Sequence, residues 1–270
     1  MAVLAADSSV DAAAVSPVKI AVRDVSKSFG GRVVLDDISL DIRQGEFVVL
    51  IGPSGGGKTT LLRLLNRLAE PDEGHVFMDG RDIARIPGAD LRSRMGYVIQ
   101  GGGLFPHLTV RRNIDIMMRN AGVDKAEAAA KVDRLMDMVD LDRTLADAYP
   151  CQLSGGQQQR VGVAHAFAMD PGVILMDEPF SALDPLTRQD LQDQLLELHR
   201  ESGKTFVFVT HDMDEAVRLA DRICVIQHGK VVQFDAPSHI LAHPVSDFVV
   251  RFIGRARSIS DALVQGSDAA

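Results

Sequence analysis

The sequence predicts an α/β fold with a largely parallel sheet, because short apolar runs alternate along the chain with helix-like segments. The apolar runs at residues 47–50 and 173–176 are continuous and indicate buried strands, and the segment from Thr205 to Val209 predicts another. Asp184-Pro185 supplies a helix N-cap followed by proline in the first helical position, so a helix is expected to begin there. A helical block at about residues 104–165 interrupts the alternation and is expected to form an inserted subdomain.

The N-terminal part of the chain carries a different pattern. Alternating apolar residues between Val18 and Asp41 predict two antiparallel strands that turn at Gly30-Gly31. Phe29 lies directly before that turn and is a candidate for stacking on an adenine ring. On local sequence alone, an apolar residue that merely closes a strand is the favoured explanation.

The segment between the first buried strand and the next helix has the form G-x-x-x-x-G-K-T, from Gly52 to Thr59. This spacing in a strand–loop–helix context is typical of a phosphate-binding loop. Glycines let backbone N–H groups wrap a phosphate closely, Lys58 can reach the β- and γ-phosphates, and the Thr59 hydroxyl can ligate Mg²⁺. An ordinary glycine-rich turn is disfavoured, because every fixed position of the motif is present in the right context.

A pair of acidic residues, Asp177-Glu178, follows the buried run at 173–176. Ligands of open α/β sheets bind at the carboxyl ends of the strands, so this pair is expected to face the phosphate loop. Asp177 is predicted to hold Mg²⁺, directly or through water, and Glu178 to polarise the water that attacks the γ-phosphate. Acidic pairs are common at strand ends, and the phosphate loop upstream is what favours the functional interpretation.

Two further segments place polar residues at the ends of predicted helices or strands. Ser154-Gly155-Gly156-Gln157 begins a predicted helix and offers a second anion site. One nucleotide does not need two phosphate cradles on one molecule, so a homodimer or pseudo-dimer is expected, in which this site covers the ATP of the other subunit.

The run at 205–209 ends at Thr210-His211, and Asp212 and Glu215 are expected to cap the next helix. Alone, His211 would most often be a structural histidine.

Composition excludes several classes of protein. The chain of 270 residues has 46% hydrophobic and 24% charged residues, which is typical of a soluble globular protein. No apolar run approaches the length that spans a bilayer, so a membrane-spanning chain is not expected. The net charge of −8 argues against a nucleic-acid binder that relies on bulk electrostatics. Cys151 and Cys224 form no ligand or redox motif, which suits a reducing cytosol.

Together these motifs resemble those of the ATP-binding subunits of ABC transporters, over about residues 18–252. The resemblance implies a P-loop NTPase (RecA-like) core with an antiparallel β subdomain and an inserted α-helical signature subdomain. It implies ATP and Mg²⁺ as ligands, with Thr59, Gln100 and Asp177 at the metal and Glu178, His211 and Gln100 in catalysis. Nucleotide-binding roles are implied for Phe29 (where tyrosine is usual), Gly52, Pro53, Ser54, Gly55, Gly56, Gly57, Lys58, Thr59, Thr60, the signature residues Ser154, Gly155, Gly156 and Gln157, and the D-loop residue Asp184.

Longer runs resemble the importers of osmoprotectants such as glycine betaine and choline: residues 65–71, 96–100, 103–110, 154–163 and 210–216. This finer resemblance implies an ATP-hydrolysing subunit that works as a homodimer beneath two membrane permease subunits, with a substrate-binding protein. It would be peripheral, on the cytoplasmic face of the inner membrane, with no nucleic-acid partner. The alternatives are import of another small polar solute such as an amino acid, an exporter subunit, and a soluble non-transport ABC ATPase.

Several features depart from that subfamily or lie outside its motifs. Gly101-Gly102 replaces bulkier residues, which is expected to loosen contact with a membrane subunit, and His165 stands where arginine is usual. Many members carry C-terminal CBS domains, and salt sensing by such domains is not expected here. Residues 1–17 have no basic segment of a signal peptide and are expected to be a disordered extension, and residues 253–270 are expected to be a C-terminal tail.

Overall fold

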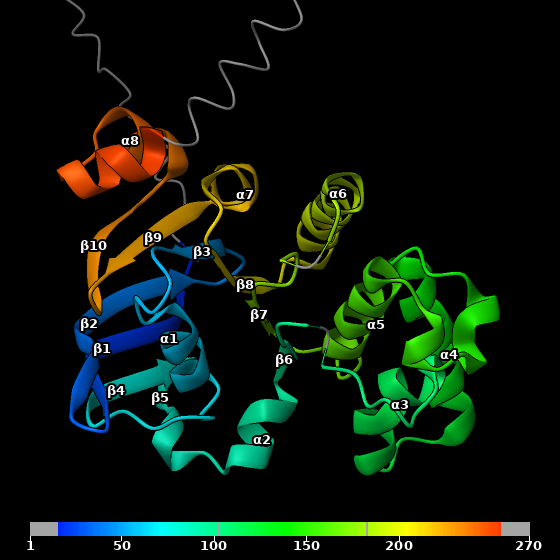
Figure 1. The fold of residues 1–270 in the computed structure, drawn as a ribbon. Helices are drawn as coiled ribbons and strands as arrows, with labels where there is room; N and C mark the ends of the chain where they lie inside the picture. The colour runs from blue at the N-terminus through cyan, green and yellow to red at the C-terminus, as the bar shows by residue number, and fades with distance from the viewer. Residues whose placement is uncertain (1–15, 102, 182, 255–270) are drawn as a thin grey trace, which may run out of the picture.

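The computed structural model describes residues 16–101, 103–181 and 183–254. The predicted extension and tail therefore lie almost entirely outside the described residues, as do Gly102 and Ala182. Within the described part, the strands form one six-stranded and one four-stranded sheet, with helices beside them (Figure 1).

The larger sheet is parallel except at one edge, as the sequence predicts. In spatial order its strands are β10 (Lys230–Asp235), β9 (Arg222–Gln227), β3 (Phe47–Ile51), β8 (Thr205–Thr210), β7 (Val173–Asp177) and β6 (Met95–Val98). Among these strands β10 alone pairs antiparallel, in a hairpin with β9. Every residue of β3, β7 and β8 is buried, which is why these strands have continuous apolar sequences.

The smaller sheet is antiparallel and contains the N-terminal strands. In spatial order it consists of β2 (Arg32–Arg43), β1 (Val18–Phe29), β4 (Glu73–Met78) and β5 (Arg81–Asp82). The turn between β1 and β2 is formed by Gly30 and Gly31, both with positive φ, as the sequence predicts. Phe29 is thereby placed at the end of β1.

Alternate residues of β3 enter two different cores. Phe47, Val49 and Ile51 pack with the helices on one face of the parallel sheet, and Val48 and Leu50 pack on the other. The second core also contains the leucines of α1 (Lys58–Leu65) and the apolar residues of the antiparallel sheet. The parallel sheet is therefore the middle layer, with the antiparallel sheet on one side and α5 and α6 on the other (Figure 1).

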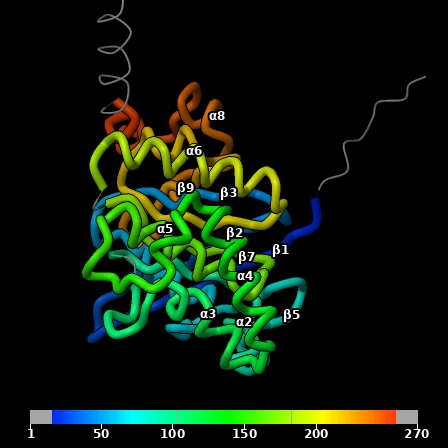
Figure 2. Tube along the Cα trace, turned by 90° about the vertical axis from the view of Figure 1, so that its right-hand side faces the viewer, coloured from blue at the N-terminus to red at the C-terminus, as the bar shows by residue number. Residues whose placement is uncertain are grey.

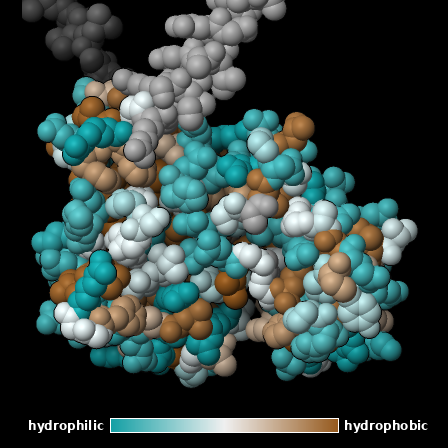
Figure 3. All heavy atoms as spheres, in the orientation of Figure 1, coloured by the Kyte–Doolittle hydropathy of each residue, from teal (hydrophilic) through white to brown (hydrophobic). Residues whose placement is uncertain are grey.

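The remaining helices complete the layers. They are η1 (Ile83–Arg85), α2 (Gly88–Ser93), α3 (Val110–Asn120), α4 (Lys125–Met138), η2 (Arg143–Asp147), η3 (Pro150–Gln152), α5 (Gly155–Phe167), α6 (Pro185–Ser202), α7 (Met213–Leu219) and α8 (Pro237–Ala242). None of the helices in the described residues is both long enough and apolar enough to span a bilayer. Figure 3 shows one face on which hydrophilic and intermediate residues predominate and apolar residues lie in scattered patches.

Helices α3, α4 and α5 pack against one another to one side of the sheets (Figures 1 and 2). The apolar stripe of α4 supplies Val132, Leu135 and Met136 to their shared core, as its helical spacing predicts. Helix α5 belongs to this group and also packs against β6 and α6. It therefore connects the helical group to the parallel sheet.

His165 connects α5 to α3 within this helical group. Its Nδ1 lies 2.7 Å from the backbone carbonyl oxygen of Asn113, so the tautomer with a proton on Nδ1 donates this bond. The Asn113 side chain accepts from Phe105 N at 2.7 Å and donates to the carbonyls of Phe105, Leu108 and Thr109. Burial lowers the pKa of His165, so the imidazole is neutral where it meets α3.

We expect His165 to make the fold sensitive to mild acid. Because its pKa is lowered in the folded protein, the unfolded chain binds the proton first as the pH falls through about 6.5. The free energy of unfolding then falls by about 1.4 kcal/mol for each unit by which the folded pKa is lowered. In His165→Gln this part of the decrease is lost, as measured by thermal unfolding at about pH 7.5 and about pH 5.5. The exposed His107→Gln is the control, and equal acid sensitivity of the two variants would contradict the assignment.

Candidate functional site

The loop between β3 and α1 has a conformation that only glycine tolerates at two positions. Gly52 has φ 154°, and a Cβ there would lie 2.0 Å from the carbonyl oxygen of Ile226 on β9. Gly57 has φ 104°, and a Cβ would lie 2.6 Å from Leu35 Cδ2. Strands β9 and β2, one from each sheet, thus pack closely against the loop. This crowding explains the glycines at both ends of the G-x-x-x-x-G motif.

Lys58 is held inside the curve of this loop. Its side chain is buried, and its Nζ donates to the carbonyl oxygens of Gly52 at 2.8 Å and Pro53 at 3.1 Å. An ammonium group has three donors, so one is left to meet an anion. Burial lowers the pKa of Lys58, against the opposing influence of the Glu178 and Asp177 carboxylates. A phosphate in the loop would supply the counter-charge that the buried ammonium needs.

Thr59 and Asp177 come together as the sequence predicts. The Thr59 Oγ1 donates to Asp177 Oδ1 at 2.9 Å, which joins the start of α1 to the end of β7. Asp177 is nearly inaccessible, and burial raises the pKa of its carboxyl. A hydroxyl and a carboxylate next to a phosphate loop are the oxygen donors that Mg²⁺ prefers, so the residues present fit this metal.

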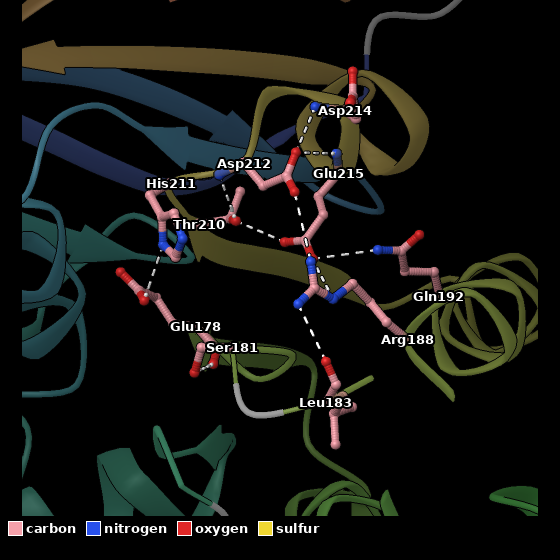
Figure 4. A network of polar contacts seen from close by, with 10 residues as sticks. All are labelled: Glu178, Ser181, Leu183, Arg188, Gln192, Thr210, His211, Asp212, Asp214 and Glu215. Carbon is pink, nitrogen blue, oxygen red and sulfur yellow. Dashed lines mark hydrogen bonds and ion pairs between the residues drawn. The ribbon is translucent and has the colours of Figure 1, made fainter. Parts of the chain in front are cut away.

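Glu178 and His211 are the second pair brought together. Glu178 Oε2 lies 3.2 Å from His211 Nδ1, across the ends of β7 and β8 (Figure 4). Glu178 has φ 43°, an uncommon conformation for a residue with a side chain, and its N–H donates to the carbonyl of Val209 at 3.0 Å. The carboxylate is therefore held at the strand edge in a fixed direction beside the imidazole.

The segment around His211 contains a contact that sequence analysis predicted wrongly. Asp212 does cap α7, because its Oδ1 accepts from the N–H groups of Asp214 at 2.8 Å and Glu215 at 3.4 Å. Glu215 makes no cap, since its carboxylate is buried and accepts from the Thr210 hydroxyl at 2.6 Å (Figure 4). Asp212 already satisfies the first turn of α7, which frees Glu215 to brace Thr210.

The signature residues lie apart from the phosphate loop. Ser154 caps α5 with its hydroxyl on Gln157 N, while the Gln157 side chain accepts from Ser154 N at 2.9 Å. Ser154 and Gly155 are exposed, and Gly156 is packed so closely that a Cβ would lie 2.6 Å from Thr187 Cγ2. Figure 1 shows α5 and α1 on opposite sides of the parallel strands. Within one chain, this turn and the phosphate loop, the two predicted anion sites, therefore lie apart from each other (Figure 1).

Three other predicted site residues lie at the edges of these sites. Gln100 is exposed in the turn after β6. Phe29 is 53% exposed, and Lys27 Nζ lies 5.3 Å from its ring centroid, so the ring is accessible for stacking. Asp184 is exposed and caps α6 by accepting from Thr187 N at 3.1 Å. The structure does not bring these three side chains into direct contact with the phosphate loop.

The structure adds residues to the site that sequence analysis did not identify. Arg188 and Gln192 of α6 meet Glu215 and form one polar network with Thr210 (Figure 4). In the sequence, Arg188 and Gln192 have only the spacing of polar positions on a helix. Nothing in that local pattern shows that they face β8 and α7.

Comparison with known proteins agrees with the motifs. A carnitine transport ATP-binding protein of Listeria monocytogenes serotype 1/2a (strain 10403S) is 48% identical over 236 residues, 87% of this chain. This chain spans 59% of the length of that relative. A glycine betaine uptake system ATP-binding protein of Escherichia coli (strain K12) is 49% identical over 86% of this chain and 75% of its own length.

The fold matches solved structures as well. A dimeric bacterial ABC transporter cassette aligns with a TM-score of 0.74 at 34% identity, over 81% of this chain and 98% of that one. The sequence model of the ABC transporter family matches residues 35–181, which include the phosphate loop, the signature turn and Asp177-Glu178. With this match and close relatives that agree with it, the chain belongs to the ABC transporter family.

Proposed function

We propose that this chain is the ATP-hydrolysing subunit of an importer for osmoprotectants such as glycine betaine, choline or a related quaternary amine. The observation that carries the proposal is the assembly of two pairs at one sheet edge: Thr59 with Asp177, and Glu178 with His211. Lys58 and the phosphate loop lie beside them. These groups suffice to bind a triphosphate with Mg²⁺ and to direct a water at its γ-phosphate.

In this proposal each residue acts on a specific atom. The loop N–H groups and Lys58 bind the β- and γ-phosphates. Thr59 and Asp177, with Gln100 from the turn after β6, would hold Mg²⁺, which would neutralise charge on the phosphate oxygens. Glu178 accepts the proton of the attacking water, and ADP leaves with the electrons of the broken P–O bond. His211 steadies the Glu178 carboxylate and contacts the γ-phosphate. The site is suited to a hydrolase because the base and the phosphate loop follow strands β7 and β3, whose carboxyl ends lie at the same edge of the sheet on either side of β8.

The separation of the two predicted anion sites supports a homodimer. The exposed N-terminus of α5 with Ser154 and Gly155 has no phosphate within its own chain to bind, and in a head-to-tail dimer it would cover the ATP of the other subunit. To shift the closed-to-open ratio of the dimer from 1:99 to 99:1, ATP must bind the closed form more tightly than the open form by about 5.5 kcal/mol. Two buried triphosphates supply it, and their hydrolysis reopens the pair.

The partners in this proposal are two membrane permease subunits and a substrate-binding protein. The similarity to carnitine and glycine betaine transport proteins supports this assignment and a place on the cytoplasmic face of the cell membrane. The exposed Phe105 and the loop that Asn113 braces are the proposed contact with the permease. Import of another small polar solute, such as an amino acid, is the alternative, because solute selection belongs to the other subunits.

We expect Glu178→Gln to bind ATP normally and to hydrolyse it about 10²- to 10⁴-fold more slowly, because an amide cannot accept the proton of water. Turnover is measured by phosphate release, and ATP-bound dimer by size-exclusion chromatography with light scattering. The exposed Glu201→Gln on α6 is the matched control. Unchanged turnover in Glu178→Gln would remove this residue from the role of base.

We expect Asp177→Asn to raise the Mg²⁺ concentration needed for half-maximal hydrolysis by at least about tenfold, because a buried carboxylate ligand is replaced by a neutral amide. Binding of ATP without metal is expected to change little. Mg²⁺ titrations of hydrolysis and of nucleotide binding separate the two effects, with the exposed Asp190→Asn as control. A parallel loss of metal-free ATP binding would instead indicate damage to the loop.

The transport part of the proposal is tested by isolating the tagged protein from gently solubilised membranes of its own organism. We expect a permease with many spans and a binding protein with an aromatic cage, because quaternary amines bind over aromatic faces. Recovery of ribosomal or DNA-repair proteins without any membrane protein would contradict the transporter assignment. That result would leave the proposed ATPase activity standing.

A further inference from the structure

Arg188 connects two parts of the site that lie far apart in the sequence. It lies in the first turn of α6, just after Asp184, and its guanidinium reaches toward α7 (Figure 4). Its Nη2 donates to the carbonyl oxygen of Leu183 at 3.3 Å. Its Nη1 lies 3.7 Å from Asp212 Oδ2, and its Nε 3.8 Å from Glu215 Oε1. One side chain thus touches the segment before α6 and the segment that carries His211.

The two carboxylates that Arg188 meets control the backbone on both sides of His211. Glu215 accepts from the Thr210 hydroxyl at 2.6 Å, and the Thr210 Oγ1 in turn accepts from Asp212 N at 3.0 Å. Asp212 also anchors the first turn of α7. The residues before and after His211 are therefore held by groups that face Arg188. A shift of Arg188 would be passed to His211 through its neighbours.

The contacts of Arg188 are incomplete in this arrangement. Its ion pairs are longer than a hydrogen bond, and its Nε is buried without a hydrogen-bond partner among the described residues. A cavity of about 40 Å³ lies here, and its lining includes Glu178, Arg188, His211 and Glu215. A cavity of that size among polar groups can hold a water molecule, which a small movement of the guanidinium would displace. A small displacement would bring Nε within hydrogen-bond distance of Glu215 and satisfy the buried donor.

We propose that Arg188 is a positioning residue that couples Leu183 and Asp184 to His211, so that the catalytic pair of one subunit responds to the segment exposed at the start of α6. This inference rests on the proposed ATPase function and extends it. In the dimer proposed above, Asp184 is exposed where a second subunit can reach it. Contact there would shift Leu183, and Arg188 would tighten on Asp212 and Glu215 and align His211 with Glu178. Arg188 itself touches neither nucleotide nor water.

The first test compares Arg188→Met with Arg218→Met. Arg218 makes a 2.6 Å ion pair with Asp193, so it also bridges α6 and α7, but without contact to the site. We expect Arg188→Met to lower kcat between about 2-fold and about 30-fold, with KM for ATP unchanged and the Hill coefficient reduced toward one. Arg218→Met should retain all three values. Equal behaviour of the two variants would overturn the coupling role.

A second variant separates coupling from folding. Arg188→Met leaves the buried Glu215 carboxylate without its cation, which is expected to destabilise the fold. Glu215→Gln combined with Arg188→Met removes both charges, while the new amide oxygen can still accept from the Thr210 hydroxyl, so thermal stability should recover. Because the Leu183 carbonyl still lacks its donor, kcat should stay low and the Hill coefficient near one. Recovery of kcat together with stability would show that Arg188 serves folding alone.

Hydrogen exchange with a non-hydrolysable ATP analogue provides a readout that does not depend on turnover. In the wild type, the analogue should protect amides of the phosphate loop, of Leu183 and of Asp212, whose N–H donates to Thr210 Oγ1 beside His211. In Arg188→Met, protection at the loop and at Leu183 should remain, and protection at Asp212 should be lost. Persistent protection at Asp212 would overturn the coupling alone. Absence of protection at the wild-type loop would overturn the proposed function, and with it the inference that rests on it.

Discussion

The arrangement of the site depends on the parallel pairing of β3, β8 and β7. In this register Ile51 pairs with Thr210, and Asp177 pairs with Val209, so all three strands end at one edge. Parallel strands carry their carboxyl ends to the same side, which is where open α/β sheets bind ligands. The phosphate loop, the acidic pair and His211 each follow one of these strands. Their proximity is therefore a direct consequence of strand direction and register.

The hydrogen bond between Thr59 and Asp177 fixes the first two of these segments relative to one another. It lies between a helix start and a strand end, in a place where Asp177 is almost removed from water. Burial raises the pKa of this carboxyl, and it lowers that of the neighbouring Lys58. Both effects oppose charge in the loop. A bound cation would favour the charged Asp177 carboxylate, and a bound polyanion would favour the charged Lys58 ammonium, so both pKa shifts would be reduced by binding.

In the proposed function, phosphate is bound at two separate places in the fold. The loop before α1 is crowded by β9 at Gly52 and by β2 at Gly57. The turn before α5 is exposed and belongs to a helix that packs with α3 and α4. His165 ties that helix to Asn113, and Asn113 orders the loop that begins at Phe105. Movement of the signature turn would thus be transmitted to the loop proposed to meet a permease.

Local sequence patterns predict the main strands, the loop between β3 and α1, the acidic pair at the end of β7 and the separate turn before α5. These follow from local rules: continuous apolar runs, glycine spacing, and capping residues whose partners lie within a few positions. The folded arrangement was needed to show that Glu215 accepts a hydrogen bond from Thr210 instead of capping α7, and that Arg188 faces both of the segments it joins. Those contacts join residues from different elements. Their formation depends on how α6 and α7 pack beside β8, which no local pattern encodes.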